Sequence, residues 1–384
     1  MQKLYKILLY ISLLCFVSIG ILLVLGYGSS AAGPLMVLMF ASLAVGVRGT
    51  DTLFKSFSFS IWIFASVSFA MFYPEYLLEV GGYKLSNLIV PLIQLIMFGM
   101  GTQLSLDDFA RVLKTPRGVV VGMACQFTIM PMLGISLALA FDFPAEVAAG
   151  VVLIGSCPGG VASNVMAFIA GANLALSISL TAVATMVSPF VTPLLMELLA
   201  GQFVPIDAYS MMFSILNMII VPIVLGLVFN HFLHGKAKWL DDVMPVVSMV
   251  GIIVIITIIT AAGRDSLVSI GLLVVMAAII HNTAGYLFGY WGSRLLGMDE
   301  QSCRTIALEV GMQNGGMASG LAAEMGKIAT VGLAPAVFGP WMDVSGSTLA
   351  NWWRRRALKE ELPVSNSSED VDAATPGKGK VASE

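Results

Sequence analysis

Long apolar segments follow one another along most of the chain, and short polar connections separate them. A helix rises about 1.5 Å per residue, so about 20 apolar residues cross the roughly 30 Å hydrocarbon core of a bilayer. Only 11% of the 384 residues are charged, whereas soluble domains carry about 25%. The sequence therefore predicts an all-α polytopic membrane protein. Twelve candidate spans can be assigned, at residues 7–26, 34–47, 57–73, 85–102, 119–140, 147–170, 174–199, 210–232, 246–262, 267–291, 303–325 and 329–352.

The charges between the spans predict the orientation of the chain. With the N-terminus inside, fifteen Lys and Arg residues fall in inside loops, and only Lys84, Arg264 and Lys327 fall outside. Cytoplasmic loops are enriched in these residues, so both termini are expected in the cytoplasm. Lys3 and Lys6 before the first span could mark a signal peptide, but its apolar stretch exceeds the ~7–15 residues of such a segment. We expect an uncleaved helix, and a bacterial inner membrane as the location.

Two spans contain helix-breaking residues near their middle. Residues 155–164 read GSCPGGVASN, and residues 309–317 read EVGMQNGGM. Proline removes a backbone donor and glycine loosens a helix, so both spans are predicted to unwind near the bilayer centre. Unpaired backbone groups at that depth are tolerated only where they face protein or a polar cavity.

The two interrupted spans occupy matching places in the chain. Spans three to seven and eight to twelve form two groups of five, and the interrupted span is the fourth member of each. An odd number of spans reverses the second copy, which is the inverted-repeat plan of secondary transporters. The alternative is that the glycines only permit close helix packing. The predicted units are two additional N-terminal helices (1–50), a first five-helix repeat (51–205), a second, inverted repeat (206–356) and a disordered cytoplasmic tail (357–384).

Polar side chains inside these spans indicate a cation site. Glu309 has no Lys or Arg near it in sequence, and an intramembrane carboxylate points by default to a cation or proton site. The alternative is a protonated Glu that bonds a neighbouring helix. Gln313 is four residues after Glu309 and would lie on the same helix face. Gln126 adds a carboxamide in the fifth span. A polar stripe on the seventh span adds Ser177, Thr181, Thr185 and Ser188.

The donor types narrow the class of ligand. Hydroxyl, carboxamide and carboxylate oxygens suit an alkali cation, and the four cysteines are too scattered for a metal cluster. Thr185 and Ser188 could instead bond their own backbone. Lys and Arg are absent from the interiors of spans six, seven and eleven, so helix N-termini and carboxamides would hold an anion. No cofactor, nucleic-acid partner or enzymatic activity is expected, and the oligomeric state is left open.

Several of these motifs together resemble the bile acid:sodium symporter family. They are Cys157-Pro158-Gly159-Gly160 with Ser163-Asn164, then Ala175-Leu176-Ser177 with Thr181, and Glu309-Val310-Gly311-Met312-Gln313-Asn314. The resemblance runs from Phe57 to Trp353 and implies a panel domain (spans three, four, eight and nine) that moves against a core domain. It implies one sodium site of Ser163, Asn164, Ser177, Thr181 and Glu309. A second site would use Gln126, Glu309, Gln313 and the carbonyls of Val310 and Met312, and Asn314 and the backbone at Val161 would face the substrate.

The resemblance implies inward sodium movement coupled to uptake of a small organic anion, such as a bile-acid-like compound, a keto acid or a pantoate-like compound. The alternative is a proton-coupled exporter of an organic anion or metalloid on the same fold. Two features depart from the family: the first two spans lie outside its pattern, and Asp343 stands where the family usually carries Asn. Asp343 could bind a proton or a third cation, repel a dianionic substrate, or be a protonated structural acid.

Overall fold

The computed structural model describes residues 2–25, 29–50, 57–105, 116–233 and 238–361. Its elements are α1 (Gln2–Val24), α2 (Ser29–Gly46), η1 (Val47–Gly49), α4 (Ser58–Phe72), α5 (Glu75–Leu78), β1 (Glu79–Val80), β2 (Tyr83–Lys84), η2 (Leu85–Leu88), α6 (Ile89–Gln103), α8 (Pro116–Ala140), α9 (Ala145–Ser156), α10 (Ala162–Ile169), α11 (Leu174–Leu195), η3 (Met196–Ala200), α12 (Ala208–Ile215), η4 (Leu216–Ile220), α13 (Val221–Leu233), α14 (Lys238–Ala262), α15 (Arg264–Leu295), α16 (Glu300–Gly311), α17 (Gly315–Glu324) and α18 (Leu333–Glu361).

Each of the twelve predicted spans coincides with a helix or with consecutive helices of the described chain. Eight of the described helices are long and apolar enough to cross a membrane by themselves. The prediction of an all-α polytopic membrane protein is therefore confirmed, whereas the inverted repeats and the domain boundaries stay predictions. Most of the predicted tail, residues 362–384, lies outside the described residues, and α18 itself continues past Arg356 to Glu361.

Three features of the backbone were not expected from the sequence. Two spans contain π-helical turns, η3 and η4, which are uncommon and are often found at functional sites. A short hairpin pairs Glu79 with Lys84 and Val80 with Tyr83. Its turn residues, Gly81 and Gly82, have φ of +60° and +85°, which glycine adopts without the cost that a Cβ imposes.

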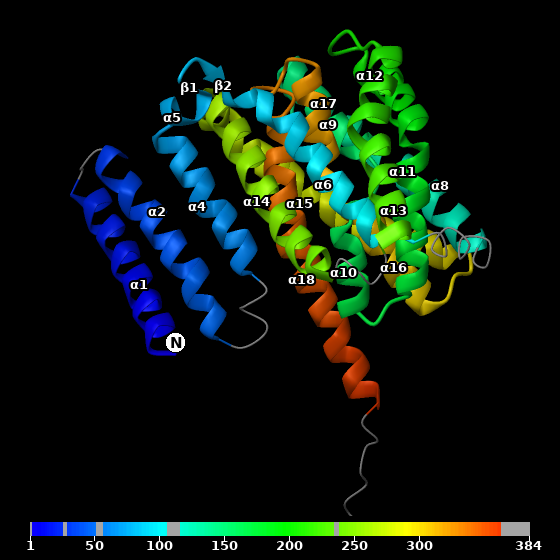
Figure 1. Cartoon of the computed structure of the whole chain (residues 1–384), viewed down its shortest axis with the longest axis horizontal. Coiled ribbons are helices and arrows are strands. Elements are labelled where there is room, and N and C mark those ends of the chain that lie inside the picture. The colour runs from blue at the N-terminus through cyan, green and yellow to red at the C-terminus, as the bar shows by residue number, and fades with distance from the viewer. Residues whose placement is uncertain (1, 26–28, 51–56, 106–115, 234–237, 362–384) are drawn as a thin grey trace, which may run out of the picture.

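The first helices form a layer along one edge of the molecule. Helix α1 packs on α2, α2 on α4, and α4 on α14, as Figure 1 shows for the blue helices at the left. The N-terminal end of α1 and the C-terminal end of α18 lie on the lower side of that view, and the β1–β2 hairpin lies on the upper side. The two ends of the described chain therefore lie on the same side.

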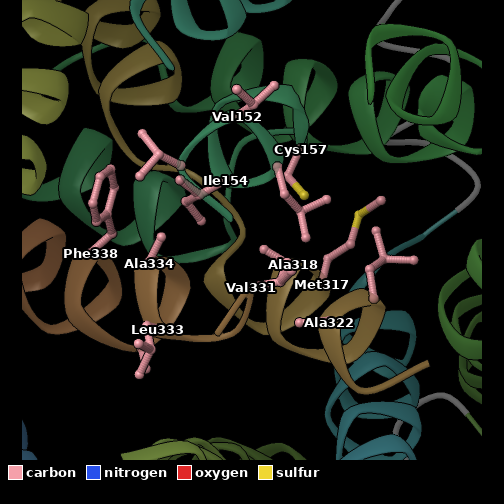
Figure 2. Packing of buried hydrophobic residues seen from close by; sticks show 14 of the residues in the cluster. Val152, Ile154, Cys157, Met317, Ala318, Ala322, Val331, Leu333, Ala334 and Phe338 are labelled. Atoms are coloured by element: carbon pink, nitrogen blue, oxygen red, sulfur yellow. The ribbon is translucent and has the colours of Figure 1, made fainter. Parts of the chain in front are cut away.

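The largest buried cluster packs one half of each interrupted span, α9 and α17, against α18. Figure 2 shows Ile154 of α9, and Cys157 at the end of α9, on the side of this helix that faces α17 and α18. A Cβ on Gly150 would lie only 2.3 Å from the carbonyl oxygen of Val331, so α9 approaches the start of α18 closely enough to require glycine. All four cysteines are free and buried, which agrees with a packing role.

Candidate cation site at the crossed helix breaks

Both interrupted spans unwind at the predicted residues. Helix α9 ends at Ser156 and α10 begins at Ala162, while α16 ends at Gly311 and α17 begins at Gly315. The intervening residues leave the helical hydrogen-bond ladder, so their backbone groups need other partners inside the membrane.

The two breaks cross and satisfy each other. The backbone N–H of Gly160 donates to the carbonyl of Met312 (2.8 Å), and the N–H of Asn314 donates to the carbonyl of Pro158 (2.9 Å). Gly159 pairs with Gln313 in an antiparallel bridge. This pairing fixes the position of one break relative to the other, and it occupies one lone pair of the Met312 carbonyl.

Glu309 is the centre of a buried oxygen cluster. Its Oε1 accepts hydrogen bonds from Ser163 Oγ (2.6 Å) and Ser177 Oγ (2.5 Å), and its Oε2 accepts one from Thr181 Oγ1 (2.9 Å). Ser177 Oγ also lies 2.8 Å from Asn164 Oδ1. Helices α10, α11 and α16 thus bring all five residues of the first implied sodium site together, and the Glu309 side chain is only 4% exposed.

The second implied group lies beside the first. Gln126 Nε2 donates to Gln313 Oε1 (2.7 Å) and to the carbonyl of Cys157 (2.9 Å), and Gln313 Nε2 donates to the carbonyl of Val310 (2.5 Å). No hydrogen bond between described residues joins the Glu309 carboxylate to either glutamine. The two groups are connected instead through the backbone turn from Glu309 to Gln313.

The residues implied to face the substrate stand at the starts of the half-helices. Asn314 caps α17, because its Oδ1 accepts from the N–H of Met317 (2.9 Å), and Val161 precedes α10. The four residues of the polar stripe on α11 do not all reach the cluster. Ser188 Oγ donates to the backbone carbonyl of Thr185 in the same helix, and Thr185 Oγ1 has no hydrogen-bond partner among the described residues. Only the first half of the stripe contributes to the cluster.

A network on α15 and α18 was missed by the sequence reasoning. Asn282 Nδ2 donates to the carbonyl of Gly311 (2.8 Å), the last residue of α16, and Ser345 Oγ donates to Asn282 Oδ1 (2.6 Å). Tyr286 OH lies 3.2 Å from Ser345 Oγ. Asn282 and Tyr286 are separated by four residues and share a helix face. This spacing of four was the one feature of the sequence that indicated a shared polar face. The sequence could not show that this face lies against a helix break.

Charged groups near the N-terminal end of α16 anchor this helix. Asp299 caps it, accepting from the N–H (3.0 Å) and the hydroxyl (2.7 Å) of Ser302. These bonds hold the pKa of the Asp299 carboxyl below its usual range. One turn later, Arg304 Nε donates to Glu300 Oε1 (2.9 Å) and its guanidinium lies 5.8 Å from the ring centroid of Trp353.

The architecture and the site define a class of protein: a polytopic α-helical membrane protein with crossed, interrupted helices around a buried carboxylate. A family model described as the sodium bile acid symporter family matches residues 90–270. A Bacillus subtilis protein named as an uncharacterized sodium-dependent transporter, YocS, is 37% identical over 316 residues, 82% of this chain and 96% of the relative. A probable chloroplastic sodium/metabolite cotransporter of Arabidopsis thaliana, BASS1, is 34% identical over 70% of this chain and 67% of its own length. The human ileal sodium/bile acid cotransporter is 34% identical over 60% of this chain and 67% of its own length.

The chain belongs to the sodium bile acid symporter family, and the resemblance seen in its motifs is confirmed. It is a multi-pass membrane protein of a sodium-dependent transporter family, and sodium is the coupling ion that the family implies.

Proposed function

We propose that this protein couples inward sodium movement to the uptake of a small organic acid, and that the Glu309 cluster binds the coupling ion. The observation that supports the proposal most directly is the meeting of a buried carboxylate with three hydroxyl groups and a carboxamide oxygen. No Lys or Arg pairs with Glu309 among the described residues. A charge in this position is costly unless a cation compensates it.

Sodium explains this cluster better than a proton does. A proton needs a single acceptor, whereas a hard cation is bound by several oxygen ligands at once. When an ion enters, the hydroxyls of Ser163, Ser177 and Thr181 can turn their hydrogens away and present lone pairs, which is the role we assign to them. Gln126, Gln313 and the carbonyls of Val310 and Met312 form the second proposed site. Two sodium ions with one monovalent anion would move one net charge, worth ~2.3 kcal/mol per 100 mV.

Alternating access requires part of the molecule to move against the crossed helices. The proposed panel consists of α4, α6, α12 with α13, and α14. Within it, α6 packs on α13 and α14, and α14 packs on α4. A pocket of about 380 Å³ lies between α6, α12, η4 and α17, at the border between this panel and the core. Across it, Ser214 Oγ of α12 lies 3.4 Å from Glu324 Oε2 of α17. We propose that this contact between Ser214 and Glu324 breaks when the transporter opens on the side where the pocket lies.

The proposed location is a bacterial inner membrane with both termini in the cytoplasm. The positive-inside bias of the loops supports this orientation, and so does the position of both ends of the described chain on one side in Figure 1. Lys84 on the hairpin would then lie outside. The proposed substrate class, a small organic acid, comes from the names of the relatives, which transport bile acid or unspecified metabolites.

The test is uptake by proteoliposomes with sodium or choline outside at one fixed pH. We expect sodium to stimulate uptake in wild type, and Glu309→Ala and Thr181→Val to lose that stimulation. Thr185→Val is the matched control, because it removes from the same helix a hydroxyl that bonds no described residue. Uptake that depends on a proton gradient and ignores sodium would favour the exporter alternative and refute the assignment.

A further inference from the structure

Asp343 lies along the second helix break. A Cβ on Gly315, the first residue of α17, would lie 3.7 Å from the Cα of Gly339 on α18. A Cβ on Gly346 would lie 2.6 Å from the sulfur of Met312, inside the break. Asp343 lies between Gly339 and Gly346 in α18, one turn after Gly339 and nearly one turn before Gly346. The carboxylate therefore belongs to the part of α18 that packs alongside the break.

The helix face places this carboxylate toward the protein interior. Residues three, four and seven positions later share a face with Asp343, and these residues, Gly346, Ser347 and Ala350, are all buried. Thr348, on the opposite face, is exposed. Asp343 is nevertheless partly accessible. Part of the Asp343 surface is therefore open to a ligand.

No described residue hydrogen-bonds or ion-pairs with Asp343, in contrast to the three hydroxyl groups that bond Glu309. Tyr286 is an electrostatic neighbour, but its hydroxyl bonds Ser345. The hydroxyl of Ser347 donates to its own backbone at residue 344 (3.0 Å). A carboxylate without a partner at membrane depth is costly and marks a functional position. Because no hydrogen bond between described residues brings another oxygen to this carboxylate, a bare metal cation would be poorly held there.

A donor for the other end of a substrate stands on the break itself. The side chain of Asn314 is 7% exposed, and its Oδ1 is occupied by the cap of α17. Its Nδ2 has no acceptor among the described residues, so two N–H donors remain for a ligand. A carboxylate can accept from them, and a positively charged group is the natural partner of Asp343.

We infer that this transporter carries a zwitterion, an organic acid whose carboxylate is held at Asn314 and whose ammonium group is bound by Asp343. The inference rests on the proposed sodium-coupled function and names the substrate class of that same site. An acid without a cationic group would be repelled by the Asp343 carboxylate, and a dianion more strongly.

The experiment compares amino acids with the oxo acids of the same carbon skeleton. Alanine is paired with pyruvate, and phenylalanine with phenylpyruvate. Binding of each to the full chain in detergent with saturating sodium is measured by calorimetry and by thermal stabilisation. Wild type is expected to bind the amino member at least tenfold more tightly in one or both pairs. Asp343→Asn should lower that ratio about tenfold or more, as expected for loss of a charged hydrogen bond, and Asp343→Glu should keep part of it. Thr348→Val, on the exposed face of the same helix, should leave the ratio unchanged.

The inference is overturned if wild type binds no amino member, if it binds the oxo members equally or more tightly, or if Asp343→Asn leaves the ratio unchanged. The last result would indicate a protonated, structural acid. Sodium-dependent stabilisation of wild type without organic ligand separates the two possible failures. If that stabilisation is absent, the proposed sodium coupling fails; if it is present without amino acid preference, only the substrate class fails.

Discussion

Gly159→Ala places a methyl group directly against the cation site. A Cβ at residue 159 would lie 2.8 Å from Glu309 Oε2 and 3.1 Å from the Glu309 carbonyl oxygen, whereas ordinary contacts begin at 3.4 Å. The carboxylate oxygen must therefore move by about 0.6 Å, the difference between 3.4 and 2.8 Å. That same oxygen accepts the 2.9 Å bond from Thr181, so the movement acts on the ligand cluster.

The magnitude follows from two effects. Overpacking a filled interior costs about 1–3 kcal/mol of folding free energy, which lowers the melting temperature. A lost or distorted hydrogen bond to a charged group costs about 1.5–3 kcal/mol. If this second cost falls on the ion-bound state, sodium affinity drops by about ten- to hundredfold. The assay is sodium titration of thermal stability in detergent, with the midpoint sodium concentration as the readout.

Gly271→Ala is the matched control for this prediction. In the interior of α15, a Cβ at residue 271 would lie 3.7 Å from Leu267 Cδ2, an ordinary contact. Alanine in a helix interior is favoured over glycine by about 0.5–1 kcal/mol, so this variant should be as stable as wild type or more so. An unchanged sodium midpoint in folded Gly159→Ala protein would refute the placement of Glu309 at the ion.

Three further predictions address other parts of the structure. Asn282→Ala removes the partner of the buried Gly311 carbonyl, so the free energy of unfolding in detergent should fall by about 1–3 kcal/mol. Asp299 has a lowered pKa because its carboxylate accepts from the α16 N-terminus, so its charge stabilises the fold above the ordinary pKa of about 3.9. The melting-temperature advantage of wild type over Asp299→Asn should therefore be present at neutral pH and be lost on acidification through the lowered folded-state value. A cysteine pair at Ser214 and Glu324, joined by a short thiol-reactive linker that a reductant can cleave, should stop uptake because α12 and α17 can no longer separate, and cleavage of the linker should restore it.

The cysteine-pair experiment has a control within the core. Glu146, at the start of α9, pairs with Lys327, which follows α17, so a cross-link between them joins two parts of the proposed core. Uptake should survive when cysteines at residues 146 and 327 are joined by the same thiol-reactive linker, which is long enough to replace the two long side chains. Equal inactivation of both pairs would contradict a relative movement of panel and core. An unchanged pH profile in Asp299→Asn, or undiminished stability in Asn282→Ala, would contradict the roles given to those side chains.

The spans and the breaks were predictable because their signals are local. Apolar length marks a span, and Pro158 with its neighbouring glycines marks an unwound segment wherever it occurs. The residues around Glu309 were found because hydroxyls spaced by four along one helix share a face, and because the motif resembles a family. Those signals, however, do not say which of the hydroxyls reach the carboxylate, and Thr185 does not.

Long-range contacts could not be predicted in the same way. The hydrogen bond from Gly160 to Met312 joins residues more than a hundred positions apart, and no local pattern encodes it. Nothing near Asn282 in the sequence indicates its partner, the Gly311 carbonyl at the end of α16. The partial exposure of Asp343 on a buried helix face likewise depends on how the neighbouring helices pack around α18.

The most direct test of sodium binding at Glu309 is thermal stability of the purified protein with sodium chloride or equimolar choline chloride, for wild type and Glu309→Gln. The replacement keeps the shape of the side chain and one accepting oxygen, turns the other oxygen into an NH2 donor, and removes the charge. We expect sodium, and not choline, to raise the melting temperature of wild type, and the variant to lose this response. Equal responses of wild type and Glu309→Gln, or no sodium-specific response in wild type, would contradict the account.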